Sequence, residues 1–332
     1  LAQDFTSAYD TDTVAAFGQL DPALTDALVL VTGLRLERRD TDYSDNNGVA
    51  DDPSKSLWGG KLALEYRPDT VSRWYASLSR GYRAIGVNAG RLASETAVTD
   101  PDAVELLRGL REFDEESLLN YEIGFKGELP EHSLSTRIAL FYMDREDQQV
   151  KGSLVLPRPN GSTAFIDYTS NAAEGNNYGL ELELSWQPID QLEIYAALGL
   201  LETEFDDYIN ADGEDLSGRE QAHAPAYQYA LGGRFNFAAG FYLRLDVEGK
   251  DEFYFSDRHD VQAPAQDLVH ARLGYDAERW SVALWGRNLT DEDYTVRGFG
   301  SFGNDPRKGY ALEPYYQYGD PRQLGVSASY RF

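Results

Sequence analysis

Four histidines, His132, His223, His259 and His270, are the strongest candidates for chemistry in a chain that has no cysteine. No two of them have the spacing of metal ligands, and the His-Glu-x-x-His pattern of zinc hydrolases is absent. The lack of cysteine excludes disulfides, cysteine-ligated zinc and a cysteine nucleophile. Catalysis needs a nucleophile, a base and an orienting group together, and sequence alone cannot place a serine beside a histidine in space. His259 is therefore interpreted as a candidate for contact with a solute.

The segment Gly298-Phe-Gly-Ser-Phe-Gly303 has the spelling of a dinucleotide-binding fingerprint. That site requires a strand before the glycines and an apolar helix after them. Asn304-Asp-Pro-Arg307 follows instead, which does not start such a helix. The sequence therefore predicts no nucleotide cofactor here, and favours an aromatic loop.

Two oxygen-rich stretches, Asp40–Asp52 and Asn210–Asp215, have the side chains that calcium prefers. Neither has the full EF-hand spacing. A solvated acidic loop is the simpler interpretation, and a calcium site in these loops is kept as an expectation.

The formal net charge of −26 argues against nucleic acid as a partner, because that function needs a basic face. No run of 18 or more apolar residues is present, so no transmembrane helix is expected. The start of the chain has no initiator methionine and no signal peptide, so we expect a processed or partial chain.

Hydrophobic residues alternate with polar ones along most of the chain. In the last ten residues, Phe332, Tyr330, Ala328, Val326 and Leu324 lie on one face of a strand and the polar residues between them on the other. The same period of two recurs in segments such as Leu28–Glu37, Tyr178–Trp186 and Phe241–Lys250. About 13 strands of roughly ten residues are predicted, the length that a tilted membrane strand needs.

The predicted connections alternate between short and long. Short turns are expected near Asp21–Asp26, Pro68–Val71, Pro130–His132, Pro188–Gln191, Phe237–Gly240 and Asp276–Arg279. Long polar loops are expected at Arg39–Lys55, Arg83–Glu116, Val150–Asn176, Asp206–Ala224, Ser256–Gln266 and Thr290–Arg322. This alternation is typical of an all-β, up-and-down antiparallel transmembrane β-barrel with short periplasmic turns and long extracellular loops.

Aromatic residues at the ends of the apolar rows support this interpretation, because Trp and Tyr suit the two interfaces of a bilayer. They are Trp58, Tyr66, Trp74, Trp186, Trp280 and Tyr330. An odd number of strands leaves the first and last strands parallel, so the predicted set does not close as an antiparallel barrel by itself.

Several segments resemble the TonB-dependent outer-membrane receptors. They are Ser79-Arg-Gly-Tyr-Arg-Ala-Ile-Gly-Val-Asn88, Asn120-Tyr-Glu-Ile-Gly-Phe-Lys126, Phe141-Tyr-Met-Asp-Arg-Glu-Asp-Gln-Gln149, Tyr178-Gly-Leu-Glu-Leu-Glu183, Leu284-Trp-Gly-Arg-Asn-Leu-Thr-Asp-Glu-Asp-Tyr294 and the tail from Gly319-Asp-Pro-Arg322 to Phe332. The resemblance covers essentially all of residues 1–332. It implies the carboxy-terminal part of a 22-stranded barrel, with the family's plug domain and first nine or so strands not represented in this chain.

The resemblance also implies partners and a function. The partners are the lipid of the bacterial outer membrane, the remaining barrel and plug, the TonB complex acting through the plug, and the barrel-assembly machinery. That machinery would read the terminal Tyr330 and Phe332 as an insertion signal. The implied function is active import of a scarce bulky solute, first a ferric siderophore, and otherwise a vitamin complex or an oligosaccharide. Two alternatives are kept: a passive or structural barrel built from more than one chain, and an outer-membrane barrel hydrolase.

If the resemblance holds, loops and the upper barrel wall should contact the solute. Arginine and aromatic side chains bind anionic and catecholate-like solutes well. The ligand-binding candidates are Tyr82, Arg83, Asn88, Tyr254, Arg258, His259, Arg297, Phe299 and Phe302.

Overall fold

Antiparallel strands make up almost all of the computed structural model, which describes residues 5–89, 101–157, 163–210, 213–257, 260–299, 306–308 and 315–332. The main strands are β1 (Ser7–Leu20), β2 (Leu28–Asp45), β4 (Ser54–Tyr66), β5 (Ser72–Arg83), β8 (Glu116–Leu129), β9 (Leu134–Pro157), β10 (Thr163–Ile189), β11 (Leu192–Tyr208), β12 (Tyr227–Asn236), β13 (Phe241–Lys250), β16 (Gln266–Asp276), β17 (Trp280–Arg287) and β20 (Gln323–Tyr330).

Short elements lie in the connections between these strands. They are β3 (Ala50–Asp51), β6 (Gly86–Val87), α1 (Pro101–Gly109), β7 (Glu112–Phe113), β14 (Phe253–Tyr254), β15 (Gln262–Ala263), β18 (Thr295–Phe299) and β19 (Tyr315–Tyr318), with 3-10 turns at Pro130–His132, Ala238–Gly240 and Pro306–Lys308. No helix in the described ranges is long and apolar enough to cross a membrane.

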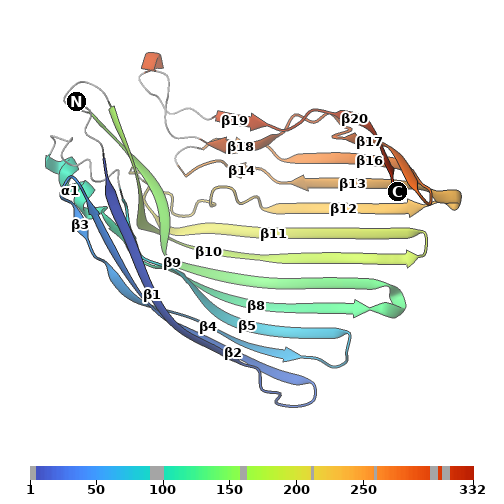
Figure 1. Ribbon diagram of the computed structural model, residues 1–332, viewed down its shortest axis with the longest axis horizontal. Coiled ribbons are helices and arrows are strands. Elements are labelled where there is room, and N and C mark those ends of the chain that lie inside the picture. Colours follow the sequence, from blue (N-terminus) through green and yellow to red (C-terminus); the bar gives the residue numbers. More distant parts are fainter. Residues whose placement is uncertain are drawn as a thin grey trace.

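The main strands form one curved meander in which each strand pairs with the next one along the chain (Figure 1). Thirteen described strands lie on this path, and β3 pairs with β2 beside it. All pairings are antiparallel, and β1 and β20 are the two ends of the path. The predicted number of strands, their up-and-down order and the all-β class are confirmed.

The short turns all lie at one end of the sheet and the long connections at the other, as predicted (Figure 1). Local hydrogen bonds close the turns. The Asp69 carboxylate accepts from the backbone N–H of Val71 (2.9 Å) and from the N–H and hydroxyl of Ser72 (both 2.7 Å). These bonds, led by that from the Ser72 hydroxyl, hold the pKa of Asp69 below its usual range.

The prediction of a loop is wrong for most of two segments. Most of Val150–Asn176 is strand: β9 continues to Pro157 and β10 begins at Thr163, so these strands have 24 and 27 residues rather than about ten. Most of Arg39–Lys55 is also strand, since β2 continues to Asp45. Above the apolar rows the backbone ladder continues without a regular alternation of apolar and polar residues, so the period-two signal disappears while the hydrogen bonding does not.

The outer face of the sheet has an apolar band between two levels of aromatic side chains. On β10 the row runs from Tyr178 to Trp186, eight residue steps, or roughly 26 Å along the strand at about 3.3 Å per residue. A strand tilt of about 40° reduces this to about 20 Å across the bilayer, close to the apolar band of an outer-membrane barrel. Tyr121, Tyr142 and Tyr178 form the row at the loop end, with ring centroids 6.4 Å apart.

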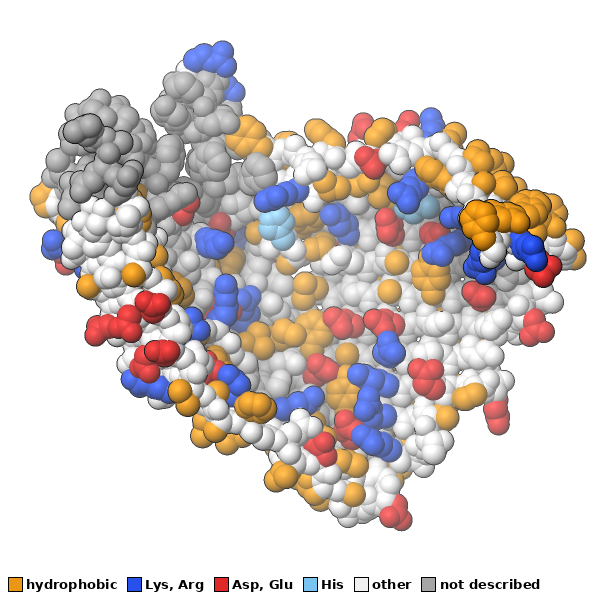
Figure 2. Space-filling view, viewed as in Figure 1, with side chains coloured by type: hydrophobic (Ala, Val, Ile, Leu, Met, Phe, Trp, Pro, Cys, Tyr) orange, Lys and Arg blue, Asp and Glu red, His pale blue; other side chains and the backbone are white. Residues whose placement is uncertain are grey.

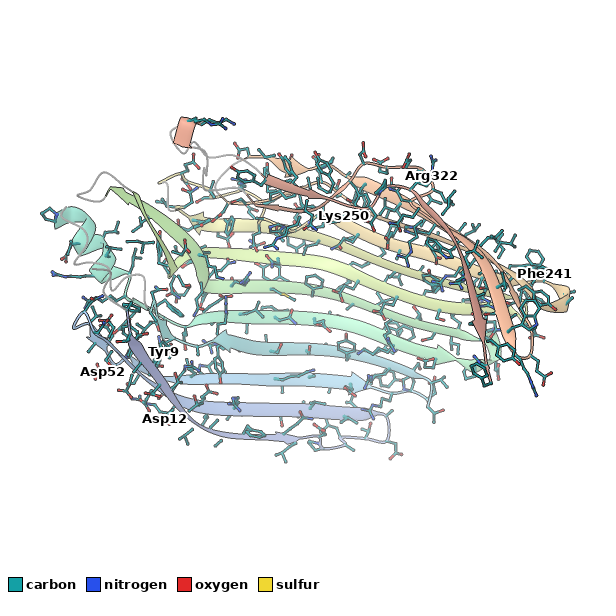
Figure 3. The ribbon with its side chains drawn as sticks, turned by 45° about the horizontal axis from the view of Figure 1, so that its top comes forward. Tyr9, Asp12, Asp52, Phe241, Lys250 and Arg322 are labelled. Atoms are coloured by element: carbon teal, nitrogen blue, oxygen red, sulfur yellow. The ribbon has the colours of Figure 1, made fainter. Side chains whose placement is uncertain are left out.

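The row at the turn end includes Tyr66, Trp74, Phe125, Trp186, Trp280 and Tyr330, and five of these six side chains are exposed on the outer face. Trp74 packs against Phe125 with ring centroids 4.4 Å apart. Trp280 lies opposite Tyr330 on the last strand. Phe241, at the start of β13, marks the same end in Figure 3.

The inner face follows a different rule, in which an aromatic ring lies over the glycine directly opposite it on the next strand. In each case a Cβ on that glycine would overlap the ring, so only glycine lets the ring lie flat on the wall. The five pairs are Tyr75–Gly124, Phe141–Gly179, Tyr195–Gly232, Tyr242–Gly274 and Trp285–Gly325.

Buried apolar clusters in the described residues lie at the loop end, beneath the connections. Leu107 of α1 packs on Ile166 of β10, and both are almost fully buried. A second cluster joins Phe205, Tyr208 and Leu216. A third joins Phe253 of β14 and the nearby Phe255 to Ala263 of β15. The middle of the sheet instead carries acidic and basic side chains on the face seen in Figure 2.

Candidate ligand-binding surface

The predicted ligand-binding residues fall into two groups at the loop end. Tyr82, Arg83 and Asn88 lie at the end of β5 and in the connection after it, and Tyr254 and Arg297 lie on β14 and β18. Phe299 is the last residue of β18, opposite Tyr315. Arg258, His259 and Phe302 lie outside the described residues, so their assignment stays a prediction.

Tyr82 belongs to a polar network on the wall. Its hydroxyl donates to Glu37 (2.9 Å) and accepts from Nε of Arg35 (3.2 Å). Arg35 also forms an ion pair with Glu37 at 2.5 Å. All three side chains are thus already satisfied by one another, which favours a structural role for Tyr82.

Arg83 lies beside a buried carboxylate. Glu116 is 6% exposed and is contacted by Arg145 at 2.5 Å, by Arg83 at 3.6 Å and by the backbone N–H of Gln149 at 3.0 Å. The Arg83 side chain itself is 62% exposed. It therefore contributes charge to Glu116 while its guanidinium also faces solvent.

Asn88 joins two distant segments. Its Nδ2 donates to the carbonyl oxygens of Leu110 (2.8 Å) and Thr169 (2.7 Å), and its Oδ1 accepts from the N–H of Thr169 (2.8 Å). Both Nδ2 and Oδ1 of this amide are therefore engaged in hydrogen bonds with the protein itself. Asn88 fixes the connection that contains α1 to β10, and the structure gives it no free polar atom for a solute.

The second group belongs to an aromatic and cationic cluster formed by the connections between β11 and β12, between β13 and β16, and between β17 and β20. Arg219 lies over the ring of Tyr254, 4.1 Å from its centroid, and Lys250 lies over the ring of Phe253 at 4.6 Å. Lys250 is labelled in Figure 3 at the loop end of β13. The Arg219 guanidinium also donates to the carbonyl of Ser256 (3.0 Å) and contacts Asp260 (3.3 Å), so its position is fixed.

His223 lies behind this cluster. Its backbone N–H donates to the carbonyl of Tyr254 (2.9 Å), and its ring centroid is 5.7 Å from that of Phe253. Burial lowers the pKa of His223, and the nearby charges of Lys250 and Arg297 act in the same direction, whereas a backbone hydrogen bond with Phe255 opposes them. The imidazole is therefore neutral at pH 7, and the positive charge of the cluster comes from lysine and arginine.

The β18–β19 hairpin forms the third side. Phe255 packs over Gly298, where a Cβ would overlap its ring, and against Tyr316 with ring centroids 5.3 Å apart. This contact places Arg297 near His223. We call Arg219, His223, Lys250, Tyr254 and Arg297 the cationic–aromatic cluster.

A pocket of about 310 Å³ is lined by Arg219 and Tyr254 together with Glu220, Asp251 and Glu252. The guanidinium and the ring of the cation–π pair are the groups of this lining that can hold an anionic or aromatic group. Of this cluster, Tyr254 and Arg297 were predicted from the sequence, whereas Arg219, His223 and Lys250 were not. The available signal was that Arg219 is the only lysine or arginine between Phe205 and Ala226.

The expected calcium loop has other contacts. In Asp40–Asp52, Asp45 accepts from the N–H groups of Asn47 (2.8 Å) and Val49 (3.2 Å) and from the Tyr43 hydroxyl (2.9 Å). Figure 3 shows Asp12 and Asp52 towards the loop end of the sheet. No group of three or more His, Cys, Asp or Glu side chains in the described ranges is arranged to hold a metal ion. Calcium binding stays a prediction.

These features define a class of protein: an outer-membrane β-barrel wall with a lipid-facing outer surface, a polar inner surface and packed connections at its loop end. Residues 2–289 match the family described as TonB dependent receptor-like, beta-barrel. The chain therefore belongs to the TonB-dependent receptor family, as part of its β-barrel, and its location is the bacterial outer membrane.

Individual relatives agree with this membership. The chain is 25% identical over 206 residues to the ferric-pyoverdine M114 receptor PbuA of Pseudomonas sp. (strain M114), an alignment that covers 57% of this chain and 23% of that protein. It superposes on the ferric yersiniabactin uptake receptor FyuA of Yersinia pestis with a TM-score of 0.72 at 21% identity, covering 99% of this chain and 47% of that one.

The siderophore receptor PiuA of Acinetobacter baumannii gives a TM-score of 0.71 at 17% identity, covering 98% of this chain and 43% of that one. At these identities the superpositions show a common fold. The chain spans less than half the length of these relatives.

Proposed function

We propose that the protein is the carboxy-terminal barrel wall of a receptor that imports a ferric siderophore across the outer membrane, energised by the TonB complex through a plug domain. Two relatives are named as receptors for ferric siderophores, and a third is named as a siderophore receptor. Insertion by the barrel-assembly machinery through Tyr330 and Phe332 is part of this proposal. Transport rather than catalysis is proposed because the relatives are named as receptors.

The cationic–aromatic cluster is the observation that supports the choice of solute. Ferric siderophores that carry catecholate or carboxylate groups are anionic and bulky, and guanidinium and aromatic groups are good partners for them. The cluster lies at the loop end, where the connections of a membrane barrel face the outside. A vitamin complex and an oligosaccharide remain the competing solutes.

The test uses a strain in which the full-length protein is the sole receptor of its kind. Uptake of radio-iron is measured for catecholate, hydroxamate and carboxylate complexes, with cobalamin and a maltodextrin as the other candidate solutes, with and without TonB. We expect uptake of at least one ferric complex that stops without TonB, while binding to cells persists. Uptake independent of TonB, or of cobalamin or maltodextrin only, would contradict the proposal.

A matched pair of variants tests the cluster. Arg219→Gln removes the guanidinium over Tyr254, and we expect about tenfold weaker binding of the iron complex. Arg234→Gln removes an equivalent guanidinium, 3.8 Å from the Tyr242 centroid, at the turn end of the inner wall. It should leave binding unchanged. Equal losses in both variants would show that the cluster is not the binding surface.

A further inference from the structure

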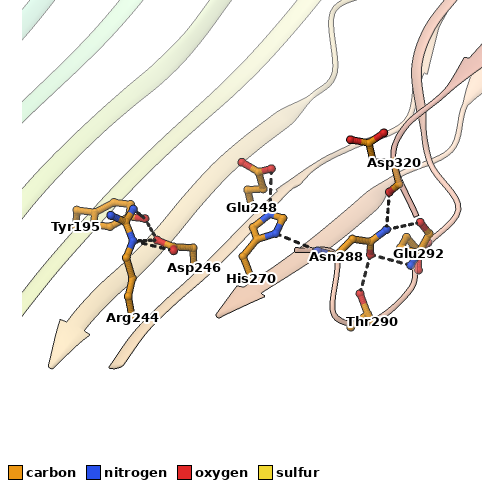
Figure 4. Close-up of polar contacts among 9 residues, drawn as sticks. All are labelled: Tyr195, Arg244, Asp246, Glu248, His270, Asn288, Thr290, Glu292 and Asp320. Carbon is orange, nitrogen blue, oxygen red and sulfur yellow. Dashed lines mark hydrogen bonds and ion pairs between the residues drawn. The ribbon is translucent and has the colours of Figure 1, made fainter. Parts of the chain in front are cut away.

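A second polar cluster lies below the cationic–aromatic cluster, where β17 ends (Figure 4). Asn288 is 2% exposed and is the first residue after β17. Its Oδ1 accepts from the N–H of Glu292 (2.9 Å), and its Nδ2 donates to the carbonyls of Glu292 (2.8 Å) and Asp320 (3.2 Å). Asn288 thus closes the turn that leads into β18 and connects it to the segment that leads into β20.

The side chain of His270, on β16, holds this turn to the wall. The backbone N–H of Asn288 donates to Nδ1 of His270 at 3.1 Å. Because Nδ1 accepts, the proton of the neutral ring is on Nε2, which lies 3.4 Å from Oε1 of Glu248. The imidazole therefore bridges the turn on one side and a β13 carboxylate on the other.

Other charged groups surround the same imidazole. Asp246 and Arg244 of β13 line the same pocket of about 460 Å³, as do Arg287 of β17 and Asp320. Tyr195 of β11 and Tyr294 complete the titratable groups of the lining, and Arg272 is on the same strand as His270. Asp246 is already held by Arg244 at 2.9 Å and by the Tyr195 hydroxyl, so Glu248 is the carboxylate directed to His270 (Figure 4).

We propose that His270 is a proton-controlled latch for the turn at Asn288, and that it regulates the cationic–aromatic cluster through the β18–β19 hairpin. The neutral imidazole accepts from Asn288 and holds the turn. The doubly protonated ring has no acceptor, because both nitrogens are then donors. Protonation exchanges the bond with Asn288 for a stronger one with Glu248, so each protonation state has its own partner.

Only a short segment of chain joins the turn at Asn288 to the cationic–aromatic cluster. Tyr294 leads directly into β18, which carries Arg297 and the Gly298 that lies under Phe255. Release of the turn loosens the strand that forms one side of the cluster, so acid should weaken binding there. This regulation rests on the proposed function, whereas the latch itself does not.

Two substitutions test the roles of the two ring nitrogens of His270 one at a time. The Oδ1 of asparagine takes the place of Nδ1 and cannot be protonated at the pH used, so His270→Asn keeps the acceptor. The amide of glutamine extends to the place of Nε2, so His270→Gln keeps the contact with Glu248 and loses the acceptor for Asn288. Both side chains are polar and smaller than or similar to histidine, and folding is checked by heat-modifiable mobility.

Hydrogen exchange of residues 288–299 is measured in the full-length protein at about pH 7.5 and about pH 5.5, the range in which histidine changes charge, with correction for intrinsic exchange. Loss of one part-buried hydrogen bond should speed exchange by about three- to tenfold. We expect this acceleration for wild type at the lower pH only, for His270→Gln at both and for His270→Asn at neither.

Wild-type protection that is unchanged at the lower pH would overturn the latch. An equal acid response in His270→Asn would also overturn it, because this variant has no imidazole at the turn. Binding of a radio-iron-labelled tris-catecholate is measured in parallel, and should weaken with acid in wild type but not in His270→Asn. If exchange follows the expected pattern and the tris-catecholate does not bind at either pH, the latch stands and its regulatory role for that solute fails. If it binds with no change between the two pH values, the regulation fails while the proposed function stands.

Discussion

Charged side chains near the loop end are neutralised by neighbours where they are buried. Glu116 is contacted by two arginines and one backbone N–H, while Glu37 is paired with Arg35 and Tyr82. A buried carboxylate without such partners would be costly. In a chain with a net charge of −26, these arginines are therefore placed where a carboxylate loses water.

Removing the charge of Glu116 should loosen the top of β8 and β9. Glu116→Gln leaves Arg145 with no carboxylate partner in a part-buried place, and we expect a loss of about 2–4 kcal/mol in unfolding free energy. Urea unfolding of the protein in detergent measures this change. Glu193→Gln, on the exposed inner face of β11, is the control and should change stability by less than about 0.5 kcal/mol. Similar small losses in both would show that the Glu116 contacts carry no stability.

At the scale of the element, sequence alternation predicted the strands well where one face of the sheet meets lipid. Leu28–Glu37 and Tyr178–Trp186 were predicted as strands and lie in β2 and β10, and the predicted strand Gln323–Phe332 is β20 up to Tyr330. The continuations of β9 and β10 above the membrane were predicted as loop, because an apolar row is needed for burial in lipid and not for backbone pairing.

The candidate site was only partly predictable. Tyr254 and Arg297 were selected for their chemistry, and the structure brings them into one cluster. The structural role of Asn88 could not be predicted, because its partner Thr169 is 81 residues away and the contact depends on how β10 meets the connection after β5. Arg219 was missed because its cation–π partner lies on a different connection.

The rings that lie over glycines on the inner face give a prediction for one element pair. A Cβ at Gly232 would overlap the Tyr195 ring and approach Oδ1 of Asp246, so Gly232→Ala forces this ring off the wall. We expect a loss of about 1–3 kcal/mol in unfolding free energy. Gly199→Ala is the matched control, because it lies on the adjacent strand β11 and a Cβ there meets nothing within 4 Å.

Heat-modifiable mobility and urea titration measure both variants. A second comparison, Gly232→Ala combined with Tyr195→Ala, should recover part of the loss, since the ring that the new Cβ displaces is gone. Equal stability of Gly232→Ala and Gly199→Ala would mean that the wall yields to the extra methyl group.

At the scale of the whole molecule, one sheet separates two different surroundings. The outer face carries leucine, isoleucine and aromatic side chains that are exposed in the protein and need lipid to cover them. The inner face carries ion pairs and hydroxyl–carboxylate contacts that need water or a polar partner. Adjacent residues on a strand therefore experience opposite media, and the apolar medium is lipid rather than a protein core.

This difference predicts opposite outcomes for the same substitution at neighbouring positions. Ile138 lies on the outer face in the middle of the apolar band, opposite Leu182, and Ala139 lies on the inner face opposite Glu181. Ile138→Arg should lower the unfolding free energy in vesicles by about 2–4 kcal/mol, the cost of arginine near the bilayer midplane. Ala139→Arg places its guanidinium near the Glu181 carboxylate and should cost much less. Urea titration of the protein refolded into vesicles measures both changes, and in detergent micelles, which adapt to a charge, the difference should shrink. A larger loss for Ala139→Arg would reverse the assignment of the two faces and with it the membrane orientation of the sheet.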